Sequence, residues 1–284
     1  MTEPRPVVAV QSSQPTIEGA GVRLNRAFGY YEAHHLDPFL LLDDFHSADP
    51  RDYIAGFPWH PHRGIETVTY VIEGNVDHGD SIGNSGTIGS GDVQWMTAGG
   101  GIVHQEMPRV YSGMMQGFQL WVNLPASNKM MAPRYRGITK EQIPTSTPSK
   151  GVGMKVIAGK VGRIEGPVTD LIVEAEYLDV QMNPYAEFDH KTRKGWKTFA
   201  YVFGGDGSFD PANRDKVGTE NLLVFGNGDS VVSRAGKNGL RFLLVSGKPI
   251  GEPIAWRGPI VMNTEEELET AYEEYWSGRF LKHT

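Results

Sequence analysis

Cysteine is absent from this sequence of 284 residues, and its absence removes several kinds of site at once. Without thiols the chain can form no disulfide bond, hold no zinc ribbon or iron–sulfur cluster, and use no thiolate nucleophile. Any metal must therefore be bound through nitrogen and oxygen atoms.

A concentrated run of lysine and arginine is also lacking, and the net charge is −7 at pH 7. Because binding to phosphates needs a clustered Lys/Arg face, this balance disfavours nucleic acid as a direct ligand. No stretch approaches about 18 uninterrupted apolar residues, so we expect no membrane span and no membrane partner. The first residues show no basic segment followed by an apolar stretch of signal-peptide length, which makes a cytoplasmic protein the default expectation.

Glycine and proline are plentiful, with 35 and 18 residues, and they separate short segments rich in β-branched and aromatic residues. Such segments are typical of short strands joined by tight turns. The candidate strands cover 66–72, 93–96 and 117–124 in the first part of the chain and 171–182, 198–203, 221–225 and 240–246 in the second. The pattern predicts an all-β protein made of two similar halves.

Between these halves, residues 126–153 change in character, because proline, serine, threonine and lysine accumulate there. A composition of this kind is typical of a connection between domains. We therefore expect an N-terminal domain over 1–135, a linker over 136–155 and a C-terminal domain over 156–284.

The end of the chain departs from the strand pattern. Thr264 and Glu267 have the spacing of a capping box, and Gly278 is placed to end a helix. Between them, apolar residues recur at helical spacing and would form one stripe: Leu268, Ala271, Tyr272, Tyr275 and Trp276. The sequence predicts a helix over 265–277 that packs against a barrel.

Three of the nine histidines fall into two compact patterns, His60-Pro-His62 and His104-Gln-Glu106. In a strand, residues i and i+2 point to the same face and lie roughly 6.5 to 7 Å apart, so both side chains can reach one metal ion. A His-x-His pair alone is common without a metal. The second pair strengthens the signal, because two such strands facing each other in a barrel would bring four ligands together.

The segments around these pairs resemble the cupin superfamily and, more closely, pirin and the pirin-like proteins. Gly56, His60, His62, Glu66 and Gly74 match the first cupin motif, and Gly91, Gly99 and His104 match the second. Ala98 stands where cupins usually carry proline, and the motif spacings also differ from the general pattern. The resemblance to pirins is better, through FPWHPHRGIETVTYVIEG, GDVQWMTAGGGIVHQEMP, GFQLWVNLP and PIVMNTEEELETAYEEYWSGRF.

This resemblance covers nearly the whole chain and is weakest over 126–170. It implies two tandem cupin barrels, each a double-stranded β-helix or jelly roll, followed by a C-terminal α-helix. It places one metal ion in the first barrel. The second barrel is expected to be metal-free, because His190 is its one candidate and has no histidine two residues away.

Two glutamates compete for the place of carboxylate ligand. Glu66 shares the strand parity of His60 and His62, and many cupins use the glutamate at that place. The resemblance to pirins instead implies Glu106, and Arg63-Gly64 could bend the strand and turn Glu66 away. We expect His60, His62, His104 and Glu106 to bind the metal, with Glu66 nearby or in an ion pair.

Strands close to the motifs carry further side chains that could line a pocket: Trp95, Met96, Phe118, Gln119 and Trp121. Strand periodicity alone does not decide which of them face the barrel interior. Core packing is the default, and we assign none of them to a substrate.

Three imidazoles and one carboxylate suit a divalent transition metal, with Fe(II) expected first and Mn, Co, Ni, Cu or Zn as alternatives. Several pirin-like proteins open the flavonol quercetin as quercetin 2,3-dioxygenases. The resemblance thus implies a metal-dependent dioxygenase that acts on a flavonol-like small molecule with O2. Glu106 is the candidate catalytic residue, taking the proton of the flavonol 3-hydroxyl.

A non-enzymatic function is the competing hypothesis. Other pirins resemble iron-binding, redox-sensing regulators that bind transcription factors or metabolic enzymes, so a protein partner is the alternative to a substrate. The lack of a basic run of the nuclear-localisation kind counts against a nuclear version. A metal-independent sugar isomerase of the cupin type is disfavoured by the full ligand set.

Overall fold

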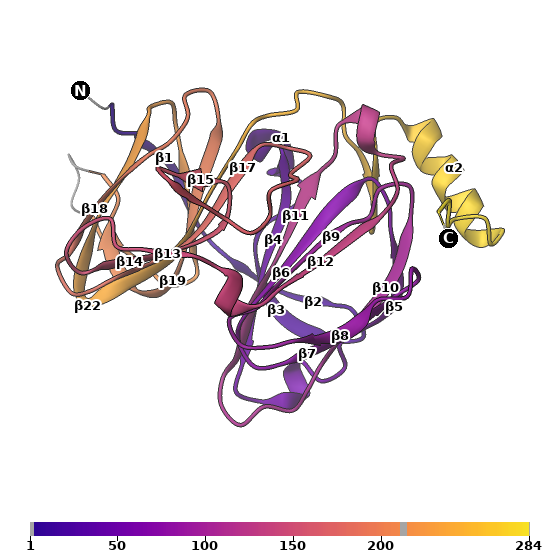
Figure 1. Cartoon of the computed structure of the whole chain (residues 1–284), viewed down its shortest axis with the longest axis horizontal. Coiled ribbons are helices and arrows are strands. Elements are labelled where there is room, and N and C mark those ends of the chain that lie inside the picture. The colour runs from indigo at the N-terminus through magenta and orange to yellow at the C-terminus, as the bar shows by residue number, and fades with distance from the viewer. Residues whose placement is uncertain (1–2, 211–214, 284) are drawn as a thin grey trace. The chain divides into compact units, whose positions relative to one another are not determined.

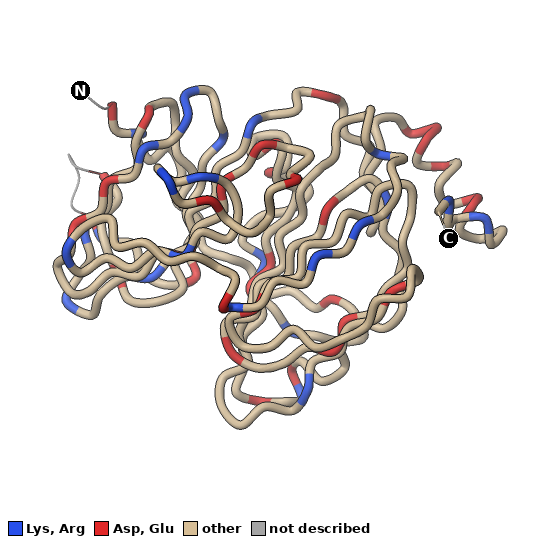
Figure 2. The backbone as a smooth tube through the Cα atoms, viewed as in Figure 1, with Lys and Arg blue, Asp and Glu red and all other residues tan. Residues whose placement is uncertain are grey.

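The computed structural model describes residues 3–210 and 215–283. Its regular structure is mostly β-strand, and the described residues form two α-helices, α1 (Ala33–Leu36) and α2 (Glu265–Trp276) (Figure 1). The all-β class with a C-terminal helix is confirmed. Neither of these helices has the length and apolar character needed to span a bilayer. Acidic and basic residues are scattered over the backbone tube of both units (Figure 2).

Contacts within the chain divide it into two compact units. The larger unit contains residues 14–140 and 250–284, and the smaller unit contains residues 1–13 and 141–249. This division lies close to the expected boundary in the middle of the chain but differs from it at both ends, because each terminal segment joins the unit built by the other half. The segment expected as a linker includes the end of one strand, a whole short strand and the start of another.

The larger unit is built from two antiparallel sheets. The first has the strand order β12-β9-β6-β11-β4-β3-β2 and the second has the order β5-β10-β7-β8. The strands of the first sheet are β2 (Gln14–Glu18), β3 (Val22–Phe28), β4 (Phe39–Ser47), β6 (Ile65–Glu73), β9 (Val93–Thr97), β11 (Met115–Asn123) and β12 (Arg134–Ile138). Those of the second are β5 (Phe57–His62), β7 (Val76–Asp80), β8 (Ser85–Ile88) and β10 (Ile102–Pro108).

The interior of this unit is set by alternation along the strands. On β10 every second residue is buried, so His104 and Glu106 share the inward face while Gln105 lies on the other. Nearly every residue of β6 is buried, which agrees with its β-branched and aromatic composition. Between β5 and β6 the chain turns at Gly64, whose φ of 77° favours glycine.

The smaller unit is a nine-stranded antiparallel sheet with the main order β1-β21-β19-β22-β17-β14-β13. Its strands are β1 (Val7–Ser12), β13 (Thr145–Ser146), β14 (Val152–Ala158), β17 (Ala175–Met182), β18 (Glu187–Lys191), β19 (Lys197–Ser208), β20 (Val217–Gly218), β21 (Asn221–Phe225) and β22 (Ser230–Gly247). Short hairpins are formed by β15 (Lys160–Val161) with β16 (Ile164–Glu165) here, and by β23 (Ala255–Arg257) with β24 (Ile260–Met262) in the larger unit. Apolar side chains such as Leu178 and Phe242 fill the core of the smaller unit.

Helix α2 begins with the predicted capping box. The Thr264 side chain accepts a hydrogen bond from the backbone N–H of Glu267, and the Glu267 side chain accepts one from the backbone N–H of Thr264. Its predicted apolar stripe is only partly buried. Leu268 and Ala271 pack against the strands β23 and β24, whereas Trp276 is 76% exposed. The helix belongs to the larger unit, so the expected grouping of residues 156–284 into one domain does not match the contacts.

Candidate metal centre

Antiparallel pairing of β5 with β10 brings the three histidines together. His104 is directly opposite His60, and Ile102 is opposite His62. One ligand nitrogen from each of His60, His62 and His104 lies within 4.8 Å of the others. The predicted three-histidine cluster is therefore present, and it is the one such group of three or more metal-binding side chains among the described residues.

Backbone carbonyls orient two of the imidazole rings. His60 Nδ1 lies 2.8 Å from the carbonyl oxygen of Pro58, and His62 Nδ1 lies 3.2 Å from that of Pro259. Because a carbonyl oxygen can only accept, each Nδ1 carries the proton and each Nε2 keeps its lone pair. The two Nε2 atoms face each other at 3.1 Å, as two ligands of one ion would.

His104 supplies the test of whether a metal fits. Its side chain is 1% exposed, and neither ring nitrogen has a hydrogen-bond partner in the described part of the chain. A buried polar atom without a partner is costly, and a metal ion between the three rings would satisfy one of these nitrogens. The donor set, three imidazoles without thiolate, suits a divalent transition metal.

Burial also fixes the charge of the cluster. It lowers the pKa of His60, and it lowers the pKa values of His62 and His104 well below the usual histidine value, with the neighbouring imidazoles adding to the effect for the last two. The rings are therefore neutral at pH 7, which is the form that binds a metal.

Glu106 lies two residues beyond His104 on the inward face of β10 and is 4% exposed. Its Oε1 accepts a hydrogen bond of 2.6 Å from the Thr69 hydroxyl, and its Oε2 accepts one of 2.9 Å from the Gln119 amide. Burial raises the pKa of this carboxyl group. Glu106 is not part of the close cluster of ligand atoms, and the pairing of β10 with β5 shifts register between His104 and Glu106.

Glu66 lies in different surroundings. Because Gly64 breaks the strand, Glu66 no longer shares the face that carries the histidines of β5. Its Oε1 accepts from the Thr97 hydroxyl at 2.6 Å and lies 3.7 Å from Arg136 and 4.0 Å from Arg134. The buried carboxyl thus forms ion pairs with arginine side chains of β12.

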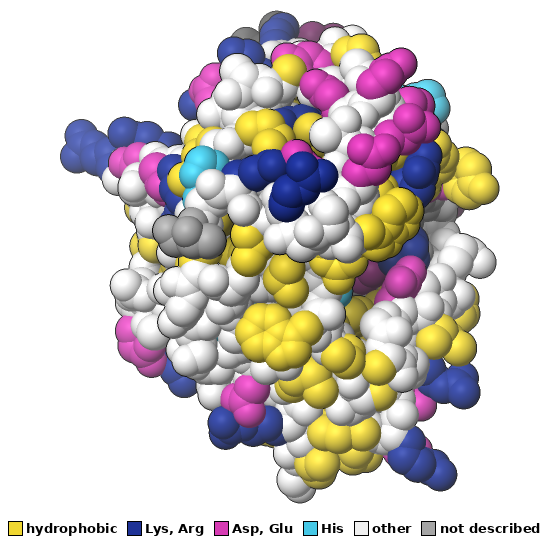
Figure 3. All heavy atoms as spheres, turned by 90° about the vertical axis from the view of Figure 1, so that its right-hand side faces the viewer, with side chains coloured by type: hydrophobic (Ala, Val, Ile, Leu, Met, Phe, Trp, Pro, Cys, Tyr) yellow, Lys and Arg dark blue, Asp and Glu magenta, His cyan; other side chains and the backbone are white. Residues whose placement is uncertain are grey.

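Two of the three histidines, His60 and His62, border a cavity of about 660 Å³. Its polar wall includes His60, His62 and Glu106, and Trp121 packs edge-on against His62 with ring centroids 5.1 Å apart. Most of the remaining wall is apolar or aromatic. Its larger members are Leu24, Tyr30, Leu41, Phe45, Tyr53, Phe57, Trp59 and Trp256. Figure 3 shows hydrophobic side chains gathered over the lower half of the face that it presents.

Of the five side chains left unassigned near the motifs, Gln119 and Trp121 line this cavity and the other three do not. Sequence reasoning did not identify Tyr30 or Trp256, because neither lies near a motif and no spacing rule connects them to it. Trp59 stands inside the first motif, next to His60, and that adjacency was the one available signal.

Two further buried histidines, His78 and His190, have partners outside the cluster. His78 stacks on Tyr135 and lies 2.7 Å from its hydroxyl oxygen. In the smaller unit, His190 Nε2 lies 2.7 Å from a carboxylate oxygen of Glu176. Each of these pairs leaves the histidine outside a metal-binding group.

Comparison with known proteins agrees with this arrangement. The chain matches the family described as Pirin over residues 21–122 and the Pirin C-terminal cupin domain over residues 177–281. A pirin-like protein of Caulobacter vibrioides is 44% identical over 277 residues, which cover 97% of this chain and 99% of that protein.

Solved structures show the same fold. A crystal structure titled quercetin 2,3-dioxygenase, from Acinetobacter baumannii, has a TM-score of 0.90 and 31% identity, with 98% of each chain covered. The Escherichia coli pirin YhhW, solved in complex with nickel(II), has a TM-score of 0.66 and 20% identity over 85% of this chain and 98% of that one. The two tandem cupin domains expected from the sequence are confirmed, and the chain belongs to the pirin family.

Proposed function

We propose that this protein is a metal-dependent dioxygenase that opens the heterocyclic ring of flavonols such as quercetin with O2. One observation carries the proposal: a cluster of three neutral imidazoles borders a largely apolar cavity, whose wall includes two of them, His60 and His62, together with the buried Glu106 carboxylate. Cavities of several hundred Å³ with apolar walls and a few placed polar groups are typical sites for small aromatic ligands. The name of the Acinetobacter structure agrees with this assignment.

His60, His62 and His104 would hold the metal through nitrogen, and we propose Glu106 as the fourth ligand. Fe(II) is our first choice, with Mn, Co, Ni, Cu and Zn as alternatives, since this ligand set accepts all of them. When bound, the metal would supply the electron chemistry between the flavonol and O2.

Glu106 is also the proposed base. Burial raises the pKa of its carboxyl group, which brings its basicity closer to that of a group working near neutral pH. The Thr69 hydroxyl and the Gln119 amide hold one oxygen each and so fix the direction of the carboxylate. In this position Glu106 takes the proton of the flavonol 3-hydroxyl at a carboxylate oxygen.

The aromatic walls would orient the substrate and exclude water. The Trp121 ring packs against His62, and its centroid lies 5.9 Å from that of the Trp256 ring. A flat aromatic ligand can stack on such rings. The same shaped cavity disfavours the competing hypothesis of a purely regulatory iron protein, which needs a functional surface elsewhere and no substrate pocket.

Metal analysis paired with a turnover assay tests the proposal. Protein loaded with Fe(II) is expected to consume quercetin and O2 in equal amounts. His104→Asn should lose both the metal and the activity, whereas Glu106→Gln should lower kcat by about a hundredfold or more, the contribution typical of general-base catalysis. His46→Asn is the matched control, because His46 pairs with Asp44 and is not part of the cluster. Metal-loaded protein that leaves quercetin unchanged would refute the enzyme assignment.

A further inference from the structure

A row of polar side chains crosses the first sheet of the larger unit. In the strand register, Thr69 of β6 is opposite Gln119 of β11, Gln119 is opposite Asp43 of β4, and Asp43 is opposite Arg26 of β3. All four residues line the cavity. At a strand spacing of about 4.8 Å the row extends roughly 14 Å across the sheet.

The two ends of the row face different chemistry. At one end, Thr69 and Gln119 donate to Glu106 beside the histidines. At the other end, Arg26 donates to both oxygens of Asp43, each at 2.8 Å, and also lies 2.9 Å from a carboxylate oxygen of Glu18. A ligand that reaches the histidines with one end can therefore meet a second polar group with the other.

The Arg26–Asp43–Glu18 cluster lies in an otherwise apolar part of the wall, beside Leu24, Leu41 and Phe45. Asp43 is nearly sealed, with 7% of its side chain exposed, but Arg26 keeps 28% and Glu18 keeps 42%. The bonds to Asp43 use Nε and Nη2, so the Nη1 side of the guanidinium points away from Asp43. An ion pair placed at a cavity wall, with part of each partner accessible, can exchange hydrogen bonds with a ligand.

The charges of the cluster select the ligand. Arginine can only donate and a carboxylate can only accept, whereas a hydroxyl group does both. One positive and two negative groups leave a local excess of negative charge, which disfavours a carboxylate or sulfate on the ligand. The cluster therefore fits a neutral hydroxyl group.

We propose that Arg26, Asp43 and Glu18 form a subsite that binds a hydroxyl group on the flavonol ring lying farthest from the histidines. This inference rests on the proposed function and specifies its substrate: a flavonol with hydroxyl groups on an outer ring, in addition to the 3-hydroxyl. Arg26 helps to select the substrate that binds and takes no part in the chemistry at the metal.

Anaerobic binding titrations with metal-loaded protein test the subsite. The two probes are quercetin, which carries hydroxyl groups on both outer rings, and 3-hydroxyflavone, which carries none there. Tryptophan fluorescence can report binding, since Trp121 and Trp256 line the cavity. Wild-type protein should bind quercetin at least tenfold more tightly than 3-hydroxyflavone, because a hydrogen bond to a charged group is worth about ten- to a hundredfold in affinity.

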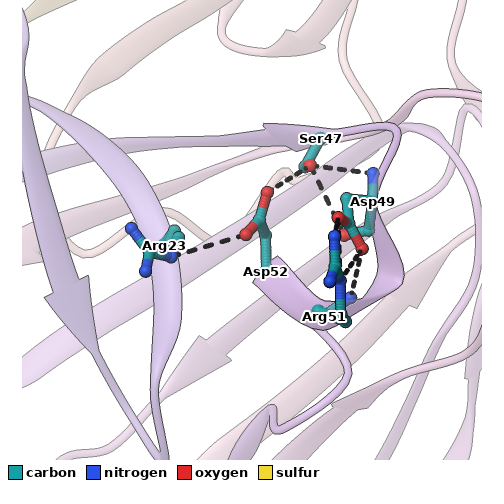
Figure 4. Close-up of polar contacts among 5 residues, drawn as sticks. All are labelled: Arg23, Ser47, Asp49, Arg51 and Asp52. Atoms are coloured by element: carbon teal, nitrogen blue, oxygen red, sulfur yellow. Dashed lines mark hydrogen bonds and ion pairs between the residues drawn. The ribbon is translucent and has the colours of Figure 1, made fainter.

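Arg26→Gln should weaken quercetin binding at least tenfold and change 3-hydroxyflavone binding by less than twofold. Arg23→Gln is the matched control, because Arg23 is on the same strand with opposite parity. Its Nε lies 3.4 Å from a carboxylate oxygen of Asp52. Figure 4 shows these two side chains facing each other. If loss of Arg26 leaves Asp43 unpaired and the variant unfolds, the double variant Arg26→Gln, Asp43→Asn removes both charges and should give the same selective loss.

Equal binding of the two flavonols by wild-type protein would overturn the subsite, and so would an equal loss for both in the Arg26 variants. Turnover is measured separately with O2. Selective binding of quercetin without turnover would support the subsite and refute the dioxygenase activity. Turnover of quercetin without selective binding would support the dioxygenase activity and refute the subsite. If neither flavonol binds, both proposals fail.

Discussion

Lys129 offers a sharp test of how the site is held in place. Its side chain is buried, and Nζ donates to three oxygens: Gly64 O at 3.0 Å, Asn123 Oδ1 at 2.8 Å and Val261 O at 2.9 Å. Gly64 is the turn that separates the histidine strand β5 from β6, and Val261 belongs to β24. One ammonium group with three donors thus joins three segments that are distant in sequence.

Lys129→Met keeps much of the aliphatic volume and removes the ammonium group. Gly64 O still accepts from the Leu124 N–H at 3.3 Å, so two buried acceptors, Asn123 Oδ1 and Val261 O, lose the ammonium donor, at about 1–3 kcal/mol each. Part of this loss is offset, because the ammonium itself is costly to bury, and burial lowers the pKa of Lys129 to about 7. We expect the free energy of unfolding to fall by about 2–4 kcal/mol, the cost of two unpaired buried acceptors less this offset.

Urea unfolding of the metal-free protein at pH 7 measures this change. Lys140→Met is the control, because Lys140 is exposed and should change the free energy of unfolding by less than about 0.5 kcal/mol. The sign of the pH dependence follows from the lowered pKa: between pH 7 and about 10.5 the unfolded chain binds more protons at Lys129, so stability rises with pH. The difference between wild type and variant should therefore widen over that range. A loss below about 1 kcal/mol, or a difference that narrows with pH, would refute the reasoning.

Three further predictions concern other parts of the larger unit. Because burial lowers the pKa values of His62 and His104, the metal-free protein should lose stability as pH falls below about 6.5. The urea concentration at the unfolding midpoint should then decrease with falling pH. This decrease should be smaller in a variant with both histidines changed to Asn. Gly64→Ala should prevent normal folding or sharply lower the melting temperature, since its φ is 77° and a Cβ atom there would strike the Val261 carbonyl oxygen. Thr264→Ala should cost about 1 kcal/mol through loss of the helix cap of α2, read from the same urea curves; no change would contradict the capping role.

The histidine cluster could be predicted because it depends on short-range geometry. His60 and His62 share a face through strand periodicity, and the single pairing that sets His104 opposite His60 completes the group. Helix α2 was similarly predictable, since its capping box and its end at Gly278 are local signals. The observed helix, Glu265–Trp276, differs from the predicted 265–277 by one residue.

The polar row could not be predicted in this way. It depends on the registers of four strands, and Arg26 is 93 positions away from Gln119 in the sequence. A shift of one residue in any pairing would turn the side chain to the other face of the sheet. The carbonyl of Pro259 that orients His62 is also out of reach, because no local pattern connects the two segments.

The place of residues 250–284 in the larger unit has a consequence for how the protein matures. Both the carbonyl oxygen beside His62 and the strand that anchors Lys129 come from this last segment. During synthesis the histidines leave the ribosome early, yet the surroundings that orient them arrive last. The metal centre of a nascent chain is therefore unfinished until translation ends, and a protein that stops before residue 250 would carry every proposed ligand without the contacts that align them.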